Sequence, residues 1–396
     1  MSDLTRRRFL LGSAAVASAA GMEAAAQPTP TDLANQPDPL LDEKELPVFR
    51  FALEQSKGKV IGGSSGKEAT VKQLPISKGI AGVSMRLEPG AMRELHWHAT
   101  AAEWAFVIEG RCRTTVIDPA GHAETNDFDP GDIWYFPRGH GHSIQCLGHK
   151  PCHFILVFDN GYFSEFSTFS VTDWLGHTPH RLLAKNLGLP EKEFDKFPTK
   201  EVYFARGPVP PETIQPEHRK VLDPPPNSHK FRMLAEKPHS LQTGGREWRV
   251  GQDRFPISTT VTGVILDLDP GGLRELHWHP NADEWQYVVS GRVRISLFGS
   301  KGRWKQETFN TGDVGFVPTG FGHSIENDSD EKSARVLIAF NTGHYQAIDL
   351  SLWLAANPDY LLAANFDRPE AVIEELPRHR VFIVSKDGPK KEAKMP

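Results

Sequence analysis

The chain repeats itself over most of its length, and this duplication constrains the fold more than any other feature of the sequence. The hexapeptide RELHWH, which begins at Arg93, reappears at Arg274, an offset of 181 residues (274 − 93). The same offset carries His142 and the two residues after it onto His323 and its neighbours. Because 396 residues are more than one hydrophobic core usually supports, the repeat predicts two domains of the same fold in tandem.

The boundaries of these domains follow from where the repeat ends and from the composition between its copies. A Pro-rich segment, GPVPPETIQPEHRKVLDPPPNSHK, separates the two halves and has the character of a linker. We therefore expect an N-terminal extension at 27–48, an N-terminal domain at 49–200, a linker at 201–230, a C-terminal domain at 231–378 and a tail at 379–396.

Short apolar or alternating runs, broken by Gly, Pro and Asp, dominate each half. Examples are GIAGVSMRLEPG, AFVIEGRCRTTVID and CHFILVFDNG, which have the length and composition of β-strands that end in turns. Helical spacing occurs in the segments 178–197 and 357–376, one near the end of each half. The sequence therefore predicts an all-β protein of the sandwich or jelly-roll type, with short helices at the end of each half.

The first residues have the features of an export signal. Arg6-Arg7-Arg8 precedes a short Ala-rich apolar stretch, and a small-residue pattern would place cleavage before Gln27. The apolar stretch is too short for a stable membrane span. We expect residues 1–26 to be a twin-arginine signal peptide, which would carry the folded protein to the periplasm or out of the cell.

Composition restricts the class of partner. The formal net charge is -5, and the Lys and Arg residues of the mature part form no basic cluster suited to nucleic acid or to a membrane surface. A small molecule is therefore the expected partner. Three cysteines are too few for a disulfide framework, and their spacing leaves open whether Cys146 and Cys152 pair across a predicted turn.

Each half carries a set of metal-ligand residue types. Residues two apart in a strand face the same side, so His96 and His98 point together while Trp97 points away. An isolated buried charge is costly, and a duplicated set of three His and one Glu is hard to explain without a cation. The two predicted metal sites are His96, His98, Glu103 and His142, and then His277, His279, Glu284 and His323. Mixed imidazole and carboxylate ligands with no thiolate favour manganese or iron.

These motifs resemble the bicupin family. The pattern Gly-x5-His-x-His-x3 or 4-Glu-x6-Gly fits both halves, and Gly-x5-Pro-x-Gly-x2-His-x3-Asn fits the second half in full. The first half departs from it because Cys146 stands where the second half has Asn327. The resemblance implies that each half is a double-stranded β-helix, the jelly-roll barrel of cupins.

A further segment resembles the lid of bacterial oxalate decarboxylases, which carries the catalytic acid in a Ser-Glu-x-Ser-Thr pentapeptide. The matching residues are Ser164, Glu165, Phe166, Ser167 and Thr168, with Phe166 in place of the more usual Asn. From Gly161 to Trp174 there are 13 steps along the chain, whereas from Gly343 to Trp353 there are 10. The N-terminal half therefore has three additional residues in this segment. The C-terminal half is therefore expected to lack this lid.

The resemblance implies a manganese- and dioxygen-dependent decarboxylase that converts oxalate to formate and carbon dioxide, with two Mn²⁺ per chain. It implies catalytic roles for Arg93 and Glu165, and substrate binding by Arg93 and Arg274. The N-terminal site would be the main catalytic site, and the C-terminal site would have a structural or electron-accepting role. An oxalate oxidase, which forms carbon dioxide and hydrogen peroxide, and a non-catalytic metal-binding bicupin are the alternatives. A homo-oligomer, a trimer or hexamer, is implied by the resemblance alone.

Overall fold

The computed structural model describes residues 44–214 and 222–389. The predicted signal at 1–26 lies outside these ranges, as do residues 27–43 of the predicted extension and the last seven residues of the predicted tail. Within the described ranges, no helix is both long enough and apolar enough to cross a bilayer.

Both halves of the repeat consist mainly of short strands. The N-terminal half contains β2 (Lys59–Ile61), β3 (Ser64–Ala69), β4 (Ala81–Leu87), β5 (Ala91–Trp97), β6 (Glu103–Glu109), β7 (Arg111–Ile117), β8 (Ala123–Phe128), β9 (Ile133–Phe136), β10 (Gly141–Leu147), β11 (Cys152–Phe158), β12 (Phe169–Ser170) and β13 (Phe204–Arg206). The C-terminal half contains β15 (Ser240–Gln242), β16 (Gly245–Val250), β17 (Thr262–Leu268), β18 (Leu273–Trp278), β19 (Glu284–Ser290), β20 (Arg292–Phe298), β21 (Trp304–Asn310), β22 (Val314–Val317), β23 (Gly322–Glu326), β24 (Ala334–Phe340), β25 (Ile348–Asp349) and β26 (Ile383–Val384). Two further strands, β1 (Arg50–Phe51) and β14 (Lys230–Phe231), each pair with the other half.

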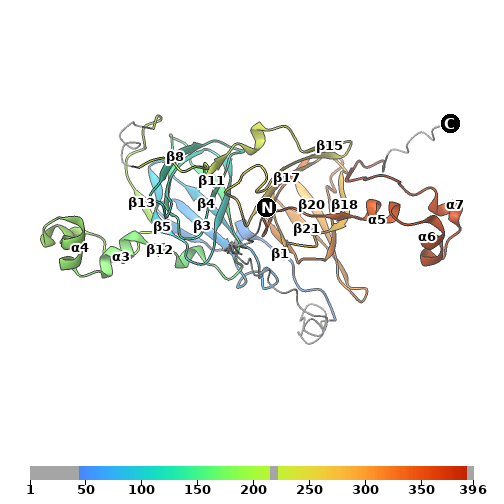
Figure 1. Cartoon of the computed structure of the whole chain (residues 1–396), viewed down its shortest axis with the longest axis horizontal. Coiled ribbons are helices and arrows are strands. Elements are labelled where there is room, and N and C mark those ends of the chain that lie inside the picture. Colours follow the sequence, from blue (N-terminus) through green and yellow to red (C-terminus); the bar gives the residue numbers. More distant parts are fainter. Residues whose placement is uncertain (1–43, 215–221, 390–396) are drawn as a thin grey trace, which may run out of the picture. The chain divides into compact units, whose positions relative to one another are not determined.

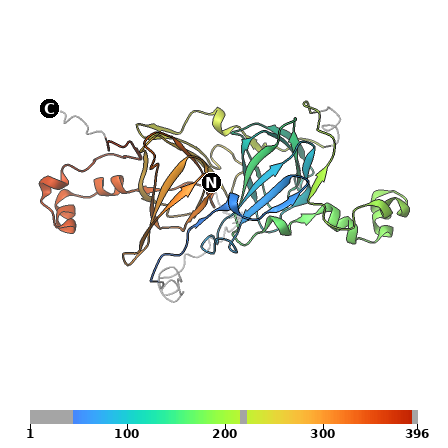
Figure 2. The same ribbon diagram turned by 180° about the vertical axis from the view of Figure 1, so that it is seen from behind.

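Each half forms a barrel of two antiparallel sheets, and the two barrels are visible in Figures 1 and 2. In the N-terminal barrel, the sheet β14-β9-β6-β11-β4-β3-β2 faces the sheet β12-β5-β10-β7-β8, with β13 added to β5. The C-terminal barrel repeats this order with β1-β22-β19-β24-β17-β16-β15 and β21-β20-β23-β18-β25, with β26 added to β18. The predicted all-β fold of two tandem cupin domains is confirmed.

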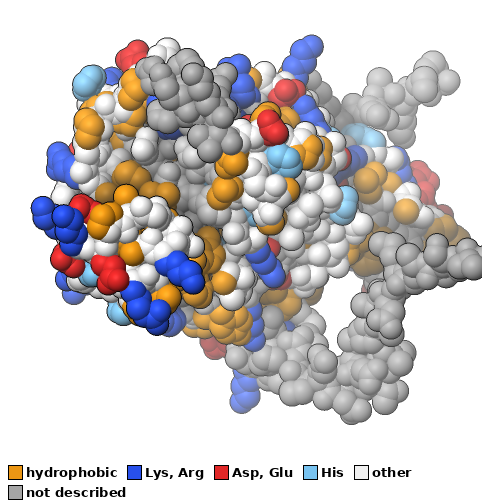
Figure 3. Space-filling model, turned by 60° about the vertical axis from the view of Figure 1, so that its left-hand side comes forward, with side chains coloured by type: hydrophobic (Ala, Val, Ile, Leu, Met, Phe, Trp, Pro, Cys, Tyr) orange, Lys and Arg blue, Asp and Glu red, His pale blue; other side chains and the backbone are white. Residues whose placement is uncertain are grey.

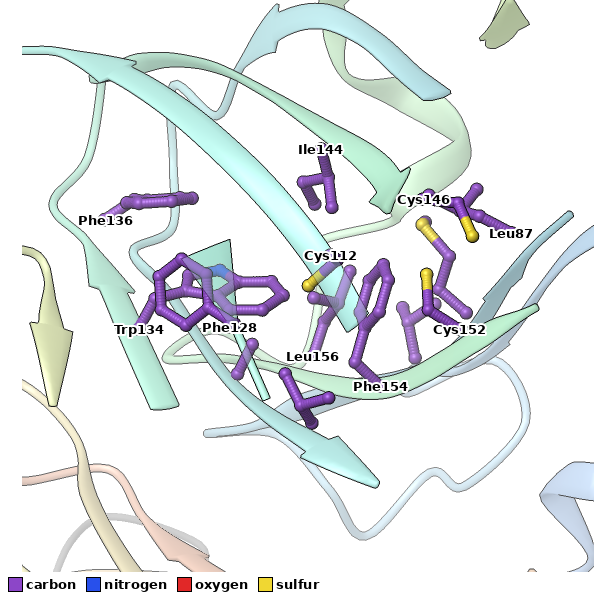
Figure 4. Packing of buried hydrophobic residues seen from close by; sticks show 14 of the residues in the cluster. Leu87, Cys112, Phe128, Trp134, Phe136, Ile144, Cys146, Cys152, Phe154 and Leu156 are labelled. Atoms are coloured by element: carbon purple, nitrogen blue, oxygen red, sulfur yellow. The ribbon is translucent and has the colours of Figure 1, made fainter. Parts of the chain in front are cut away.

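A hydrophobic core fills the N-terminal barrel between its two sheets (Figure 4). Trp134 and Phe154 come from one sheet, Cys112 and Ile144 from the other, and all four are completely buried. Apolar runs such as CHFILVF in β11 form strands because both of their faces are covered in the fold. Cys112, Cys146 and Cys152 are all free and buried in this core, so the pairing left open by the sequence is absent.

Short helices follow the last long strand of each barrel and project from it (Figures 1 and 2). The predicted helical segments are confirmed by α4 (His180–Leu187) with the 3-10 turn η3 (Glu191–Lys196), and by α6 (Asp359–Phe366) with α7 (Glu370–Ile373). Two more helices, α3 (Val171–His177) and α5 (Leu350–Ala355), precede them. We call α3 to η3 the N-terminal arm and α5 to α7 the C-terminal arm.

The two barrels exchange short strands. β1, which precedes the N-terminal barrel, pairs with β22 of the C-terminal barrel, and β14, which precedes the C-terminal barrel, pairs with β9 of the N-terminal one. The predicted linker and tail also contribute to the barrels, because β13 and β26 pair with β5 and β18. Composition did not reveal these strands because each is only two or three residues long.

Candidate metal centres

The structure brings the four predicted ligands of the N-terminal half together inside the barrel. His96 is on β5 and His98 follows it directly, Glu103 begins β6, and His142 is on β10. All four side chains are buried, and their ligand atoms lie within 4.8 Å of one another. Glu103 Oε2 is 3.2 Å from His98 Nε2 and 3.5 Å from His142 Nε2. Convergence of this kind is the geometry of a metal site.

Outer hydrogen bonds orient these side chains. The Nδ1 atoms of His96 and His142 bond to the backbone carbonyls of Glu94 and His140 at 2.6 and 2.9 Å, so their Nε2 atoms face the cluster. The indole of Trp134 donates to the outer carboxylate oxygen of Glu103 at 2.7 Å. His96 Nε2 and Glu103 Oε2 are buried and have no hydrogen-bond partner among the described residues. A bound cation would satisfy both atoms.

The electrostatics of the N-terminal cluster also suit a cation. Burial, reinforced by the nearby Arg93 guanidinium, holds the pKa of His96 well below its usual value, so the imidazole is neutral and keeps a lone pair for a metal. Burial opposes ionisation of Glu103, but His142 and His98 outweigh it and hold the pKa of this carboxyl below its usual range. The cluster therefore offers a neutral imidazole at His96 and a carboxylate at Glu103.

The C-terminal half repeats the arrangement. His277, His279, Glu284 and His323 are buried and also have ligand atoms within 4.8 Å of one another. Glu284 Oε2 is 2.9 Å from His279 Nε2 and 3.0 Å from His323 Nε2. The outer oxygen of Glu284 accepts from Gln286 Nε2 at 2.5 Å. At the 181-residue offset Gln286 corresponds to Ala105, whereas the tryptophan donor of the first site corresponds to Gly315, so the two sites use different side chains for the same hydrogen bond.

The lid pentapeptide lies against the N-terminal cluster. Ser164 precedes the 3-10 turn η2 (Glu165–Ser167), and the side chain of Glu165 is buried. Its carboxylate is 2.8 Å from Arg93 Nε, 4.0 Å from His96 Nε2 and 3.8 Å from His98 Nδ1. The side chains of Arg93 and Glu165 are both 0% exposed. The structure thus places the predicted acid and the predicted arginine together beside the ligands.

Side-chain contacts hold this pentapeptide against the cluster. Ser164 Oγ donates to both carboxylate oxygens of Glu68, at 3.1 and 2.8 Å, and Arg93 donates to Thr168 Oγ1. Phe166, the residue that departs from the family pattern, packs with its ring 6.0 Å from that of Tyr203. Ser167 is the exposed member of the pentapeptide. Sequence reasoning missed Glu68, because a single Glu in an alternating strand reads as a solvated residue.

The arginine of the C-terminal site has a different partner. Arg274 is buried, with Nη2 2.8 Å from Asp349 Oδ1, and Asp349 also pairs with Arg380. Glu247 on β16 lines the same small cavity as Arg274 and three of the four ligand residues, all but His323, and burial raises the pKa of Glu247. The space open to the centre of a water molecule in this cavity is about 10 Å³. Sequence reasoning missed Asp349 and Glu247, although comparing the halves would have found both, because they stand where the first half has Ser170 and Gly66.

Comparison with known proteins agrees with this architecture. The model of the Cupin family matches the chain twice, at residues 52–195 and 231–371. Oxalate decarboxylase OxdC of Bacillus subtilis (strain 168) is 38% identical over 352 residues, which cover 88% of this chain and 89% of that protein. A probable oxalate decarboxylase of Arthroderma benhamiae is 32% identical, over 90% of this chain and 87% of that protein.

The fold is also similar to a solved structure. Bacillus subtilis oxalate decarboxylase, in a study of the EPR fine structure of its Mn(II) centres, superposes with a TM-score of 0.81 and 37% identity. The match covers 87% of this chain and 90% of that one. The chain has two barrels of the same fold, and each holds a buried cluster of three His and one Glu. The similarity to these proteins extends along nearly the whole chain. The chain belongs to the cupin family and, within it, to the bicupin oxalate decarboxylases.

Proposed function

We propose that this protein is a manganese- and dioxygen-dependent oxalate decarboxylase that converts oxalate to formate and carbon dioxide at its N-terminal site. The observation that carries the proposal is the position of Glu165, the buried residue of the lid, in contact with Arg93 beside the ligand cluster. Relatives at 38% and 32% identity that are named oxalate decarboxylases support the choice of substrate. Each chain would hold two Mn²⁺, one in each cluster.

Arg93 supplies the positive charge that a small dianion requires. Its guanidinium is completely buried and presents several N–H donors in a fixed plane, which suits a carboxylate. In the closed structure Glu165 occupies Nε, so substrate entry requires the lid to open and release this nitrogen. Tyr203 O accepts from Nη1 at 3.3 Å and holds the arginine in place while the lid moves.

Glu165 has the position of the proton donor. Decarboxylation of the oxalate dianion breaks the carbon–carbon bond, releases carbon dioxide and leaves a one-carbon fragment that needs one proton on carbon to become formate. Manganese with dioxygen would supply reversible one-electron oxidation of the bound substrate. Glu165 would deliver the proton under the closed lid, where water is excluded. Without a positioned acid, oxidation to carbon dioxide with formation of peroxide would compete, which is the oxidase alternative.

Export and assembly are further parts of the proposal. The predicted twin-arginine signal would take the folded protein to the periplasm or out of the cell. Both arms expose large apolar side chains, among them Trp174 at 64%, Trp353 at 55% and Leu187 at 48%. Figure 3 brings the side of the N-terminal arm forward and shows hydrophobic side chains on its surface. Apolar surface of this kind is typical of interfaces, and it supports a homo-oligomer, a trimer or hexamer.

The proposed function is tested by measuring formate and hydrogen peroxide together. Manganese-loaded protein without its signal is incubated with oxalate under air at mildly acidic pH, alongside Glu165→Ala and the matched control Glu191→Ala, which changes an exposed glutamate of the N-terminal arm. We expect formate from the wild type and the control, and a shift toward peroxide in Glu165→Ala with manganese content unchanged. Peroxide without formate from the wild type would identify an oxidase, and neither product would leave a non-catalytic bicupin or another substrate.

A further inference from the structure

The two barrels place different residues at one equivalent position beside their metal clusters. Ser170 of β12 lies opposite His96 of β5, and Asp349 of β25 lies opposite His277 of β18. His96 and His277 are themselves related by the 181-residue offset. Ser170 and Asp349 are therefore structural counterparts, and each is also the residue that precedes the first helix of its arm.

The side chains of these two counterparts have different partners. Ser170 caps α3 by accepting a hydrogen bond from the backbone N–H of Asp173 at 3.2 Å. Asp349 makes no such bond to α5, although Asp is among the best capping residues. Its carboxylate is instead 1% exposed and lies between Arg274 and Arg380. Asp349 therefore forms an ion pair beside the metal cluster and does not cap its helix.

The partner of the arginine is removable in one barrel and fixed in the other. Glu165, the partner of Arg93, belongs to a surface segment held by side-chain contacts. Asp349 belongs to a strand whose backbone pairs with the strand that carries His277 and Arg274. An anion can therefore reach Arg93 when the lid moves, whereas reaching Arg274 would require Asp349 to leave two guanidinium partners, the buried Arg274 and the exposed Arg380.

The charge and the small space around Arg274 both disfavour the binding of oxalate. Glu247 adds a buried carboxyl group to the wall of the cavity, and Arg249 lies beside it, with Nη1 3.5 Å from Oε1. The corresponding position in the N-terminal barrel is Gly66, which brings no charge. The cavity has room for one water-sized molecule. Oxalate is both larger and doubly negative.

We propose that Asp349 determines the ligand specificity of the C-terminal site: it occupies Arg274 permanently, so this site admits water or another small neutral molecule and excludes carboxylate anions. The inference rests on the proposed function for its probe, oxalate, and it changes the expectation that Arg274 binds substrate. Glu247 assists by placing a further carboxyl group on the cavity wall beside Arg274. Exchange of one residue thus separates an anion-binding barrel from an anion-excluding one.

The test is a binding stoichiometry, not an activity. Manganese-loaded full-length mature protein is titrated with oxalate by calorimetry without oxygen, with the metal content of each variant measured. We expect one oxalate per chain in the wild type, none in Arg93→Ala, and one in Arg93→Ala combined with Asp349→Ser. The combination with Asp349→Asn, which keeps the size of the side chain and removes its charge, serves if the serine variant does not fold. The reciprocal variant Ser170→Asp should lose the oxalate of the N-terminal site and retain its manganese.

Each outcome decides the inference. Oxalate binding to Arg93→Ala at the wild-type level would overturn it, because the C-terminal site would then accept the anion despite Asp349. Absence of any gain on removing the Asp349 charge would also overturn it. If the proposed function is wrong, the wild type would bind no oxalate, which distinguishes that failure from failure of the inference. In that case, oxalate binding that appears only when Asp349 is replaced by Ser would still support the inference.

Discussion

At the scale of single residues, His153 shows how burial sets protonation in this protein. It lies on β11, is 6% exposed, and places Nε2 2.9 Å from Ser84 Oγ, which in turn donates to Glu54. Burial, with Arg86 nearby, lowers the pKa of His153 to about 3, and the opposing effect of Glu54 is smaller. The folded protein therefore holds this imidazole neutral at pH values where an unfolded chain would protonate it.

This protonation difference predicts a pH-dependent stability. Between about pH 3 and the ordinary His value near 6.5, the unfolded state binds one proton more than the folded state at this position. The free energy of unfolding should therefore fall as the pH is lowered through this window, by at most about 1.4 kcal/mol per pH unit from this group. Chemical denaturation of the wild type and of His153→Gln, measured from pH 4 to pH 7, should show a shallower slope for the variant.

The matched control for this prediction is His149→Gln, which changes an exposed histidine of the loop before β11. It should keep the wild-type slope. Equal slopes for the wild type and His153→Gln would contradict the assignment of this pH dependence to His153.

At the scale of elements, the lid is a short segment held at both ends by side chains. Its first residue, Ser164, both caps η2 by accepting from Phe166 N–H at 3.3 Å and donates to the buried carboxylate of Glu68. Its last residue, Thr168, accepts from Arg93. Closure therefore depends on a few hydrogen bonds to charged groups, each worth about 1.5–3 kcal/mol. The predicted metal ligands lie on the barrel strands or, for His98, directly after one, and do not share these bonds.

Removing one of these bonds should change the product without changing the metal. In Ser164→Ala the closed lid loses its bond to Glu68, so Glu165 spends less time in the position of the donor. We expect the ratio of formate to peroxide to fall, by roughly tenfold for a loss of about 1.4 kcal/mol in lid closure. Ser167→Ala, at the exposed position of the same lid, should behave like the wild type. An unchanged product ratio in Ser164→Ala would show that Glu68 does not hold the lid.

At the scale of the whole molecule, the two barrels meet through equivalent residues. An added Cβ at Gly82 of β4 would lie 2.1 Å from a ring atom of Trp285, and one at Gly263 of β17 would lie 2.2 Å from the same ring atom of Trp104. These pairs are related by the 181-residue offset, so one surface patch contacts its own copy. Both tryptophans are completely buried. The duplication therefore accounts for the contact between the barrels as well as for their folds.

This contact predicts a large effect of a small substitution. Gly82→Ala places a methyl group into the Trp285 ring, and overpacking of this kind costs about 1–3 kcal/mol. Scanning calorimetry should show a lower unfolding temperature than for the wild type. Gly207→Ala is the control, because its Cβ would meet no atom within 4 Å and its backbone φ lies outside the left-handed region. Equal losses of stability in both variants would contradict the proposed role of the contact.

The sequence by itself determined the architecture and the metal clusters. A repeat at constant offset predicts two copies of one fold, and strand periodicity places His96 and His98 on one face. Glu103 and His142 followed from their repetition at the same offset as Glu284 and His323, and helix periodicity located parts of both arms. These features are local or periodic, so they can be recognised without coordinates.

The tertiary structure decided which side chains meet across the fold. Glu68 and Ser164 are 96 residues apart, and no periodicity links them. Asp349 could have capped its helix, as its position and residue type suggest, yet the fold directs it to Arg274. The exchanged strands β1 and β14 are too short to carry a strand pattern of their own. Such contacts depend on the packing of distant segments, and for that physical reason only the folded chain distinguishes the charge environments of its two metal sites.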